Sequence, residues 1–505
     1  MLPSLRAPGR GQTRLALGAA IFVATQCLSG CASVGPQPAL ARLNLDAAAN
    51  STRSLQPVSP DAAPAAWPAG DWWRAYGDPQ LNRLVEGARD ASPTIAGALA
   101  RVRQAAALEG LAAAALGPQA SASVHSARQR YSENSSVPKP LAGSWQWAND
   151  AGVSLGYELD FWGKNASSVA AAAGRVNARQ AEAQAARLAV SSAVVQAYLQ
   201  LDHLYAQREL AEQELRQRSR IVDLVRQRVA AELDSQAELK QAEIGVPSAR
   251  GQIAALDEAL ALTRGQLAAL SGQGQDAGAA IARPHLGLTR PAGAPPDVPA
   301  ALLGRRPELV ALRWQVEAAS GDNDVARAQF YPSVNLSASA GLASLGFDRL
   351  LQGSSRTFAA GPLVTLPLLD GGRLRSNLAA RNADYDIAVE QYNGAVLEAL
   401  RDVAAQLTSL RWLDERVREQ DAALAAAEQA YALAEQRYRA GLGNFVQVLI
   451  AETQVVAQRR AQADLAARAN VLDVNLVRAL GGGYRASAPA PATKQAFSEP
   501  THDSE

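Results

Sequence analysis

A short alternating segment that runs directly into a very long helical stretch constrains the fold of this chain more than any other feature. In VSLGYELDFWGKN (153–165), Val, Leu, Tyr and Phe alternate with Ser, Gly, Glu and Asp, which is the period-two pattern of a strand with one apolar and one polar face. The stretch that follows, 165–230, is rich in Ala, Gln and Arg and contains no proline and a single glycine. It predicts one continuous helix, about 100 Å long at about 1.5 Å per residue.

The chain is an internal repeat, and the second copy supplies another strand and another long helix. LDFWGK (159–164) ends the first alternating segment, and LLDGGR (368–373) ends its counterpart. In each half, 65 residues separate the last glycine of this motif from an arginine, which is Arg228 in the first half and Arg437 in the second. Each half therefore predicts helix, strand, loop, strand, long helix, turn and helix.

The repeat divides the chain into six segments. They are a signal peptide (1–30), a linker (31–70), a first repeat (71–272), a Gly- and Pro-rich linker (273–300), a second repeat (301–482) and a disordered tail (483–505). The predicted strands are 120–130, 147–162, 333–342 and 356–368, and the predicted long helices are 165–230 and 373–440. The predicted fold class is mainly α, with a smaller β part of four strands per chain.

The long helices carry an apolar residue at nearly every seventh position. The second-half series is Val396, Val403, Leu410, Val417, Leu424, Tyr431 and Tyr438, and the first-half series is Val194, Leu201, Arg208, Leu215, Val222 and Val229. Arg208 is the one polar member. A sustained heptad predicts coiled-coil packing with left-handed supercoiling. Helical hairpins that serve only as spacers are the simpler alternative, and the seam alone does not exclude them.

The N-terminus has the pattern of a bacterial signal peptide followed by a lipid-attachment site. Three arginines precede an apolar region, 15–25, that is too short to span a membrane as a helix. The sequence LSGC (28–31) predicts cleavage before Cys31 and a covalent lipid such as palmitate on that residue, the alternative being a secretory signal with a chance cysteine. Because Cys27 would leave with the signal, no internal disulfide is expected. Ala32, rather than aspartate, follows Cys31, as in lipoproteins of the outer membrane.

Neither the charge nor the motifs predict a nucleic-acid partner or an enzyme. The formal net charge is +1, which favours no polyanionic partner. The segment GVSLG (152–156) fits the nucleophile-elbow pattern GxSxG, but the alternation continues past Ser154, where that motif needs a sharp turn. The four histidines lack a metal-binding spacing, and no nucleotide loop is present. No catalytic residue, metal or cofactor is therefore predicted, apart from the lipid on Cys31.

The strands raise the question of a membrane. Alternating strands of about ten residues are long enough to cross an outer membrane. Four strands cannot close a barrel, and an open sheet edge in lipid leaves backbone groups without partners at a high free-energy cost. Either the strands stay outside the membrane, or several chains pool them. In a pooled barrel the residues facing lipid would be Val153, Leu155, Tyr157, Leu159 and Phe161, and those facing water would be Ser154, Glu158 and Asp160.

Six segments, in order along the repeat, resemble the TolC-like outer-membrane factors, in particular their NodT-type lipoprotein branch. They are WWRAYGDPQLNRL (72–84), YELDFWGK (157–164), LLGRRPELVAL (302–312), ARAQFYPSVNLSASAG (326–341), LPLLDGGR (366–373) and RYRAGLGNFVQVLIAE (437–452). The resemblance implies a homotrimer with a twelve-stranded barrel and a tube of twelve helices. It also implies a lipid-anchored protein of the outer membrane, with its helices in the periplasm. Its function would be that of a passive exit duct served by an inner-membrane pump and a periplasmic adaptor.

The resemblance also implies roles for residues near the ends of the long helices. The turns where adaptors dock correspond to Ala440, Gly441, Leu442 and Gly443 in the second half, and to Ala231 and Leu233 in the first. In the first turn Glu232 replaces the family's glycine, which makes the two turns unequal. Tyr438 matches a tyrosine that bonds an aspartate of the neighbouring coil in the closed state, and Asp223 is expected to be that aspartate. Plain seam and surface roles for this pair are the alternative.

One departure from the family concerns the narrowest point of the duct. Gln447 and Ile450 occupy positions where family members usually carry aspartates. A ring of carboxylates attracts cations, so this chain is expected to have a weaker cation site and a hydrophobic collar at Ile450. The remaining alternative for the whole chain is a lipid-anchored periplasmic scaffold or adaptor without a pore. The cargo and the class of pump are not predicted by the sequence.

Overall fold

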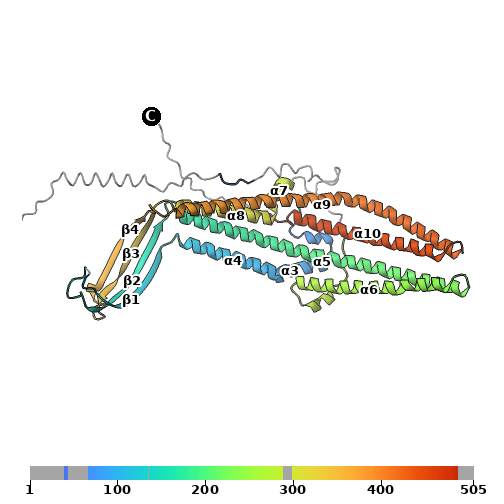
Figure 1. Cartoon of the computed structure of the whole chain (residues 1–505), viewed down its shortest axis with the longest axis horizontal. Coiled ribbons are helices and arrows are strands. Elements are labelled where there is room, and N and C mark those ends of the chain that lie inside the picture. The colour runs from blue at the N-terminus through green and yellow to red at the C-terminus, as the bar shows by residue number, and fades with distance from the viewer. Residues whose placement is uncertain (1–38, 44–65, 135, 288–297, 487–505) are drawn as a thin grey trace, which may run out of the picture. The chain divides into compact units, whose positions relative to one another are not determined.

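The structure, a computed structural model, describes residues 39–43, 66–134, 136–287 and 298–486. It consists of long helices and one antiparallel sheet (Figure 1). The helices are α3 (Pro79–Ala91), α4 (Pro93–Ala114), α5 (Lys164–Ala230), α6 (Gln236–Leu270), α7 (Val298–Arg305), α8 (Pro307–Ala328), α9 (Arg373–Arg439) and α10 (Phe445–Ala479). The 3-10 turns are η1 (Trp72–Tyr76), η2 (Gln275–Ala280) and η3 (Gly353–Ser355). Both predicted long helices are confirmed as α5 and α9.

The four predicted strands are present and form a single sheet. They are β1 (Gln119–Arg130), β2 (Trp145–Leu159), β3 (Ser333–Leu345) and β4 (Arg356–Thr365), paired antiparallel in the order β1-β2-β3-β4. The central pairing, β2 with β3, joins the two halves of the sequence. β2 ends before the predicted boundary because Asp160 to Gly163 form the turn that starts α5.

The sheet has the two different faces that the alternation predicted. Leu155 stands opposite Ala120 on one neighbouring strand and Ala338 on the other, which keeps small and apolar side chains on one face. On the opposite face, Ser154 pairs with Ser121, and their hydroxyl oxygens lie 2.8 Å apart. In the described part of the chain, β1 and β4 each leave one edge without a neighbouring strand.

The direct junction between strand and helix is made by an aspartate in each half. Asp160 accepts hydrogen bonds of 3.1 and 2.7 Å from two backbone N–H groups in the first turn of α5. Asp370 accepts bonds of 3.0 and 2.8 Å from two N–H groups at the start of α9. Such caps satisfy the free donors at a helix start and favour its dipole. β2 therefore passes into α5 through a four-residue turn, and β4 reaches α9 through residues 366–372.

Contacts divide the chain into two compact units. The first holds the described parts of 1–43, 100–179 and 312–393, and the second holds those of 44–99, 180–311 and 394–505. The first unit contains the sheet and a small core of Ala326, Phe330, Leu374 and Leu378. Its helices α5 and α8 approach closely, since a Cβ added to Gly321 would lie 2.9 Å from the Cβ of Ala171.

In the second unit, α5 with α6 and α9 with α10 form two helical hairpins (Figure 1). The WWRAYGDPQLNRL motif (72–84) packs into the core of this unit. The Tyr76 hydroxyl donates to Asp473 on α10 at 2.7 Å, and the Tyr198 hydroxyl on α5 donates to Asp78 at 2.6 Å. The motif thus ties the N-terminal part of the unit to both hairpins.

Among the helices that the structure describes, none combines the length and the apolar character needed to cross a membrane.

Candidate functional site at the helical turns

Two turns in the second unit join the long helices to their shorter partners. In both turns, the N–H that follows a left-handed residue bonds back to an arginine carbonyl, at 2.9 Å for Arg228 and 2.8 Å for Arg437. The left-handed residues are Glu232, with φ of 57°, and Gly441, with φ of 75°. This is the Schellman ending, in which glycine is the favoured residue. The two turns, expected to be unequal, share one backbone conformation.

The predicted docking residues all lie on these turns. Ala231, Leu233, Ala440, Gly441 and Leu442 are exposed, and Gly443 is half-buried. Leu233 and Leu442, at matching positions, are 65% and 73% exposed. Each turn thus presents one large apolar side chain to solvent.

Directly behind the turns, Tyr438 is 1% exposed and belongs to an apolar cluster. The buried members of the cluster are Ile221, Val222, Val225, Leu239, Ala242, Tyr438, Phe445 and Val448. They come from α5, α6, α9 and α10, so the cluster joins both hairpins. The Tyr438 and Phe445 rings lie 6.0 Å apart between centroids.

A polar cluster of three residues closes this core toward the turns. The Tyr438 hydroxyl donates a hydrogen bond to Asp234. Arg228 donates to both carboxylate oxygens of Asp234, at 2.9 and 3.1 Å, and its third nitrogen donates to the Tyr438 carbonyl at 3.1 Å. The Arg228 guanidinium also lies 4.4 Å from the centroid of the Tyr438 ring. We call Arg228, Asp234 and Tyr438 the tip lock.

The tip lock favours the ionised form of its carboxylate. Burial by itself raises the pKa of Asp234, but the hydrogen bonds from Arg228 and Tyr438 outweigh it and hold that pKa below its ordinary range. Burial, followed by the bond to Asp234, raises the pKa of the Tyr438 hydroxyl, which therefore stays protonated as a donor. A two-point bond from arginine to carboxylate is among the stronger polar contacts in proteins.

The expected pairing of Tyr438 with Asp223 is corrected by this geometry. Asp223 is exposed, and its carboxylate pairs at 2.8 Å with Arg226 on the same helix. The reason is helix phase: Val222 and Val225 face the core, which turns Asp223 to the outside. Sequence analysis used Arg228 only to align the halves and missed its role.

Gln447 and Ile450 lie on one exposed face of α10. Together with alanines of α9 they line an open groove of about 440 Å³. The lining comprises Ala423, Ala427, Ala430, Gln447, Ile450, Ala451, Gln454 and Gln458, and it carries no ionisable group. The expectation of an uncharged aperture is consistent with this groove, but the ring itself needs further copies of the chain. Cys31 lies outside the described residues.

The described residues contain no group of His, Cys, Asp and Glu side chains that could hold a metal ion. The polar contacts at the turns join the two hairpins.

Comparison with known proteins identifies the family of this chain. The family model described as outer membrane efflux protein matches residues 84–273 and 298–482. The fusaric acid resistance protein FusA of Burkholderia cepacia is 40% identical over 378 residues, covering 74% of this chain and 70% of FusA. The multidrug resistance outer membrane protein MdtP of Escherichia coli K12 is 34% identical over 439 residues, covering 84% of this chain and 88% of MdtP.

A solved structure leads to the same family. The crystal structure of the outer membrane protein VceC from Vibrio cholerae matches with a TM-score of 0.78 and 37% identity, covering 83% of this chain and 100% of VceC. The resemblance to TolC-like outer-membrane factors is therefore confirmed. This chain belongs to the outer membrane efflux protein family.

Proposed function

We propose that this chain is the outer-membrane exit duct of a tripartite efflux system, through which small molecules pass passively to the exterior. One observation carries the proposal. β2 and β4 of a two-faced sheet each lead through an aspartate-capped turn into a long helix, and the turns that follow these helices carry the tip lock and exposed leucines. The sheet is suited to lipid, and the hairpins are suited to a tube that can close.

The open sheet edges support assembly with further copies of the chain, and the family resemblance supports three copies. Backbone groups at an open edge have no partners in lipid, so β1 and β4 need strands from other copies. Three chains would supply twelve strands, with the Leu155 face toward lipid and the Ser154 face toward a watery lumen. Three chains would also pool their hairpins into a tube of twelve helices.

The remaining parts of the proposal concern location and partners. A lipid on Cys31 would anchor the chain in the outer membrane, with the hairpins in the periplasm. The exposed leucines Leu233 and Leu442 would contact a periplasmic adaptor that joins the duct to an inner-membrane pump. The duct itself would supply no energy. The names of its relatives refer to fusaric acid, to multidrug resistance and to pyoverdine, so the proposal for cargo is limited to small molecules.

The test is the mass of the particle extracted from outer membranes in mild detergent, corrected for bound detergent. Three chains per particle are expected, and the same preparation should conduct ions in a planar bilayer. Cys31→Ser should remove the lipid without releasing the strands from the membrane. A single chain per particle, or release of Cys31→Ser into the soluble fraction, would instead support the lipid-anchored scaffold without a pore.

A further inference from the structure

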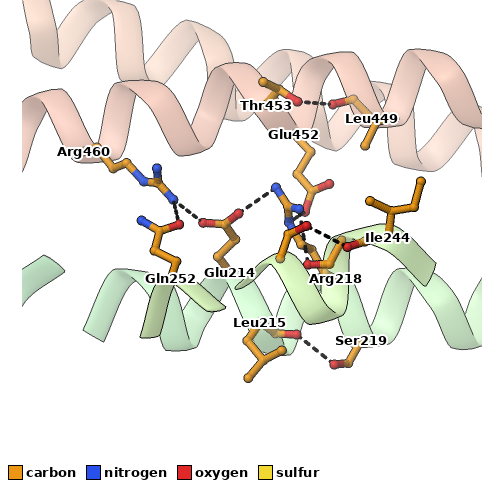
Figure 2. Close-up of polar contacts among 12 residues, drawn as sticks. Glu214, Leu215, Arg218, Ser219, Ile244, Gln252, Leu449, Glu452, Thr453 and Arg460 are labelled. Atoms are coloured by element: carbon orange, nitrogen blue, oxygen red, sulfur yellow. Dashed lines mark hydrogen bonds and ion pairs between the residues drawn. The ribbon is translucent and has the colours of Figure 1, made fainter. Parts of the chain in front are cut away.

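A second group of charged residues joins the hairpins (Figure 2). Arg460 on α10 donates to Glu214 on α5 at 2.7 Å and to Gln252 on α6 at 2.6 Å. Arg218, one turn along α5, pairs with Glu214 at 2.6 Å. It also lies 3.9 Å from the carboxylate of Glu452 on α10. We call Glu214, Arg218, Glu452 and Arg460 the charge cluster.

The two acids of the charge cluster are buried, which sets them apart from the acids of ordinary surface ion pairs. The side chains of Glu214 and Glu452 are 6% and 3% exposed, whereas those of Arg218 and Arg460 are 22% and 40% exposed. Two acids face two arginines, so the group is formally neutral. In the described structure, one oxygen of Glu452 and the Nε atom of Arg218 have no hydrogen-bond partner. A buried charge with incomplete bonding costs free energy, so this cluster is a poor device for stability alone.

Arg459 shows what an ordinary pair on this helix looks like. Arg459 forms an ion pair with Glu428 of α9 at 2.7 Å, and it connects the two helices of one hairpin. The side chain of Arg459 is 36% exposed, and that of Glu428 is 44% exposed. Its neighbour Arg460 points the other way and connects that hairpin to the first one. The two arginines are similarly exposed, at 36% for Arg459 and 40% for Arg460, but their acid partners differ, since Glu428 is 44% exposed and Glu214 only 6%.

The position of the cluster separates it from the tip lock. Glu214 precedes Arg228 by 14 residues on α5, about 20 Å along a helix. The apolar cluster behind the turns lies between them in sequence, since Ile221, Val222 and Val225 all belong to it. Next to the cluster, Arg218 and Glu452 line a cavity of about 210 Å³ with Ile221, Phe445 and Leu449. That space gives the side chains room to rearrange.

We propose that the charge cluster is a second latch, which positions the α9–α10 hairpin against α5–α6 in the resting state and must part when the duct opens. This rests on the proposed function as an exit duct. An apolar seam with a heptad repeat holds helices together but sets their register weakly, whereas charge pairs fit in one register. When the hairpins separate, water hydrates the released charges, so opening exposes no new apolar surface at this point. The charge pairs therefore fix the register of the hairpins in the resting state, and hydration of the charges allows the hairpins to separate and return.

The experiment compares two adjacent arginines in the full-length, membrane-extracted assembly. Arg460→Ala is expected to raise the open fraction in planar bilayers at least several-fold, while Arg459→Ala leaves it within about twofold of wild type, since exposed pairs contribute little. Glu214→Gln, which keeps the side-chain shape, should behave like Arg460→Ala. The double exchange Glu214→Arg with Arg460→Glu should lower the open fraction back toward wild type. Rescue of this kind would not occur if the residues only filled space.

The outcomes separate the latch from the duct. A tip-lock variant, Tyr438→Phe with Asp234→Ala, serves as a reference for an opened channel. If that variant opens while Arg460→Ala and Glu214→Gln behave like Arg459→Ala, the latch is rejected and the duct stands. Failure of the double exchange to restore closure would also reject the latch. If the wild-type particle and the reference variant both fail to conduct, the proposed function itself is overturned.

Discussion

At the scale of single residues, Glu232 occupies a conformation that glycine normally takes. Its φ of 57° matches the 75° of Gly441 in the equivalent turn. Left-handed backbone costs a residue with a side chain about 1 kcal/mol or more, whereas glycine loses more entropy on folding. The two turns therefore adopt the same backbone conformation, but the free-energy cost is strain at Glu232 and lost conformational entropy at Gly441.

This asymmetry gives the first prediction. Gly441→Ala should destabilise the assembly by roughly 1 kcal/mol, while Glu232→Gly should be neutral or slightly stabilising. Thermal unfolding of the purified assembly in detergent measures both. Equal loss of stability in the two variants would contradict the assignment of the strain to residue 232.

Glu452 carries the second prediction, which concerns pH. Burial raises the pKa of its carboxyl; Arg218 counteracts this and Glu214 adds to it. The folded chain thus binds a proton more readily than the unfolded chain. The contribution of this group to stability is present below the ordinary pKa of glutamate and is lost as the pH rises through the raised value.

The measurement is the dependence of the melting temperature on pH for wild type and Glu452→Gln. The variant, which cannot ionise there, should lose less stability than wild type when the pH rises across that window. Glu428→Gln, at an exposed pair, is the matched control and should follow wild type. Parallel curves for wild type and Glu452→Gln would show that the buried carboxyl does not titrate abnormally.

At this scale, sequence alone located the right tyrosine and the wrong aspartate. Tyr438 falls on the heptad seam, which is readable from spacing. Asp234 lies beyond the end of α5, in the turn that leads to α6. The backbone conformation of this turn determines whether the Asp234 side chain can contact Tyr438 on α9. Repeat spacing could not provide this, because the equivalent position in the second half is Gly443. The hydrogen bonds of Arg228 to Asp234 also depend on the conformation of this turn, so the sequence could not predict them.

At the scale of elements, local patterns predicted nearly all the strands and helices. The period of two placed β1 to β4, and the long stretches of helix formers placed α5 and α9. β2 and β4 end three residues before their predicted ends, where the chain turns toward a helix cap, and β3 continues three residues beyond its predicted end. The caps themselves, Asp160 and Asp370, lie within the motifs that aligned the halves. Asp160 was expected to face water at the end of a strand; it lies beyond the end of β2 and caps α5 instead, and Asp370 was given no role.

The tip lock provides the prediction for elements. Tyr438→Phe with Asp234→Ala removes the polar contacts between α9 and the α5–α6 turn, so the hairpins should separate more readily. Uptake of a large dye by cells carrying the variant should rise several-fold. Asp223→Ala, which breaks only a pair within α5, is the control and should leave uptake unchanged. An equal rise in dye uptake for Asp223→Ala would show that Asp223 also holds the hairpins together.

The lock should also resist mild acid. Because hydrogen bonds hold the pKa of Asp234 below its ordinary range, its stabilising effect is present above that range and is lost only as the pH falls through the lowered value. Conductance of the resting wild-type channel should therefore not increase between neutral pH and about pH 5, which is above the ordinary aspartate range. If the channel opened between neutral pH and about pH 5, a titratable group other than Asp234 would control its opening.

At the scale of the whole molecule, the single chain shows what its assembly must complete. The apolar face of the sheet is exposed, both of its outer edges lack a neighbouring strand in the described structure, and a groove of alanines lies open between α9 and α10. Sequence could supply the strands and their faces, because both follow from local pattern. It could not supply the number of copies, because closure depends on contacts between chains. The trimer therefore stays a prediction that rests on the family resemblance.

The aperture gives the last prediction, because only an assembled ring can test it. Gln447 and Ile450 are uncharged, so three copies would place no carboxylates around the narrowest point. A trivalent cation such as hexamminecobalt should block the wild-type channel weakly, and Gln447→Asp should create strong block by adding three charges in a ring. Gln454→Asp adds the same charge to the same groove, about 10 Å further along α10, and should block less. Equal block by both variants would place the constriction elsewhere, and strong block of wild type would mean that other carboxylates form the ring.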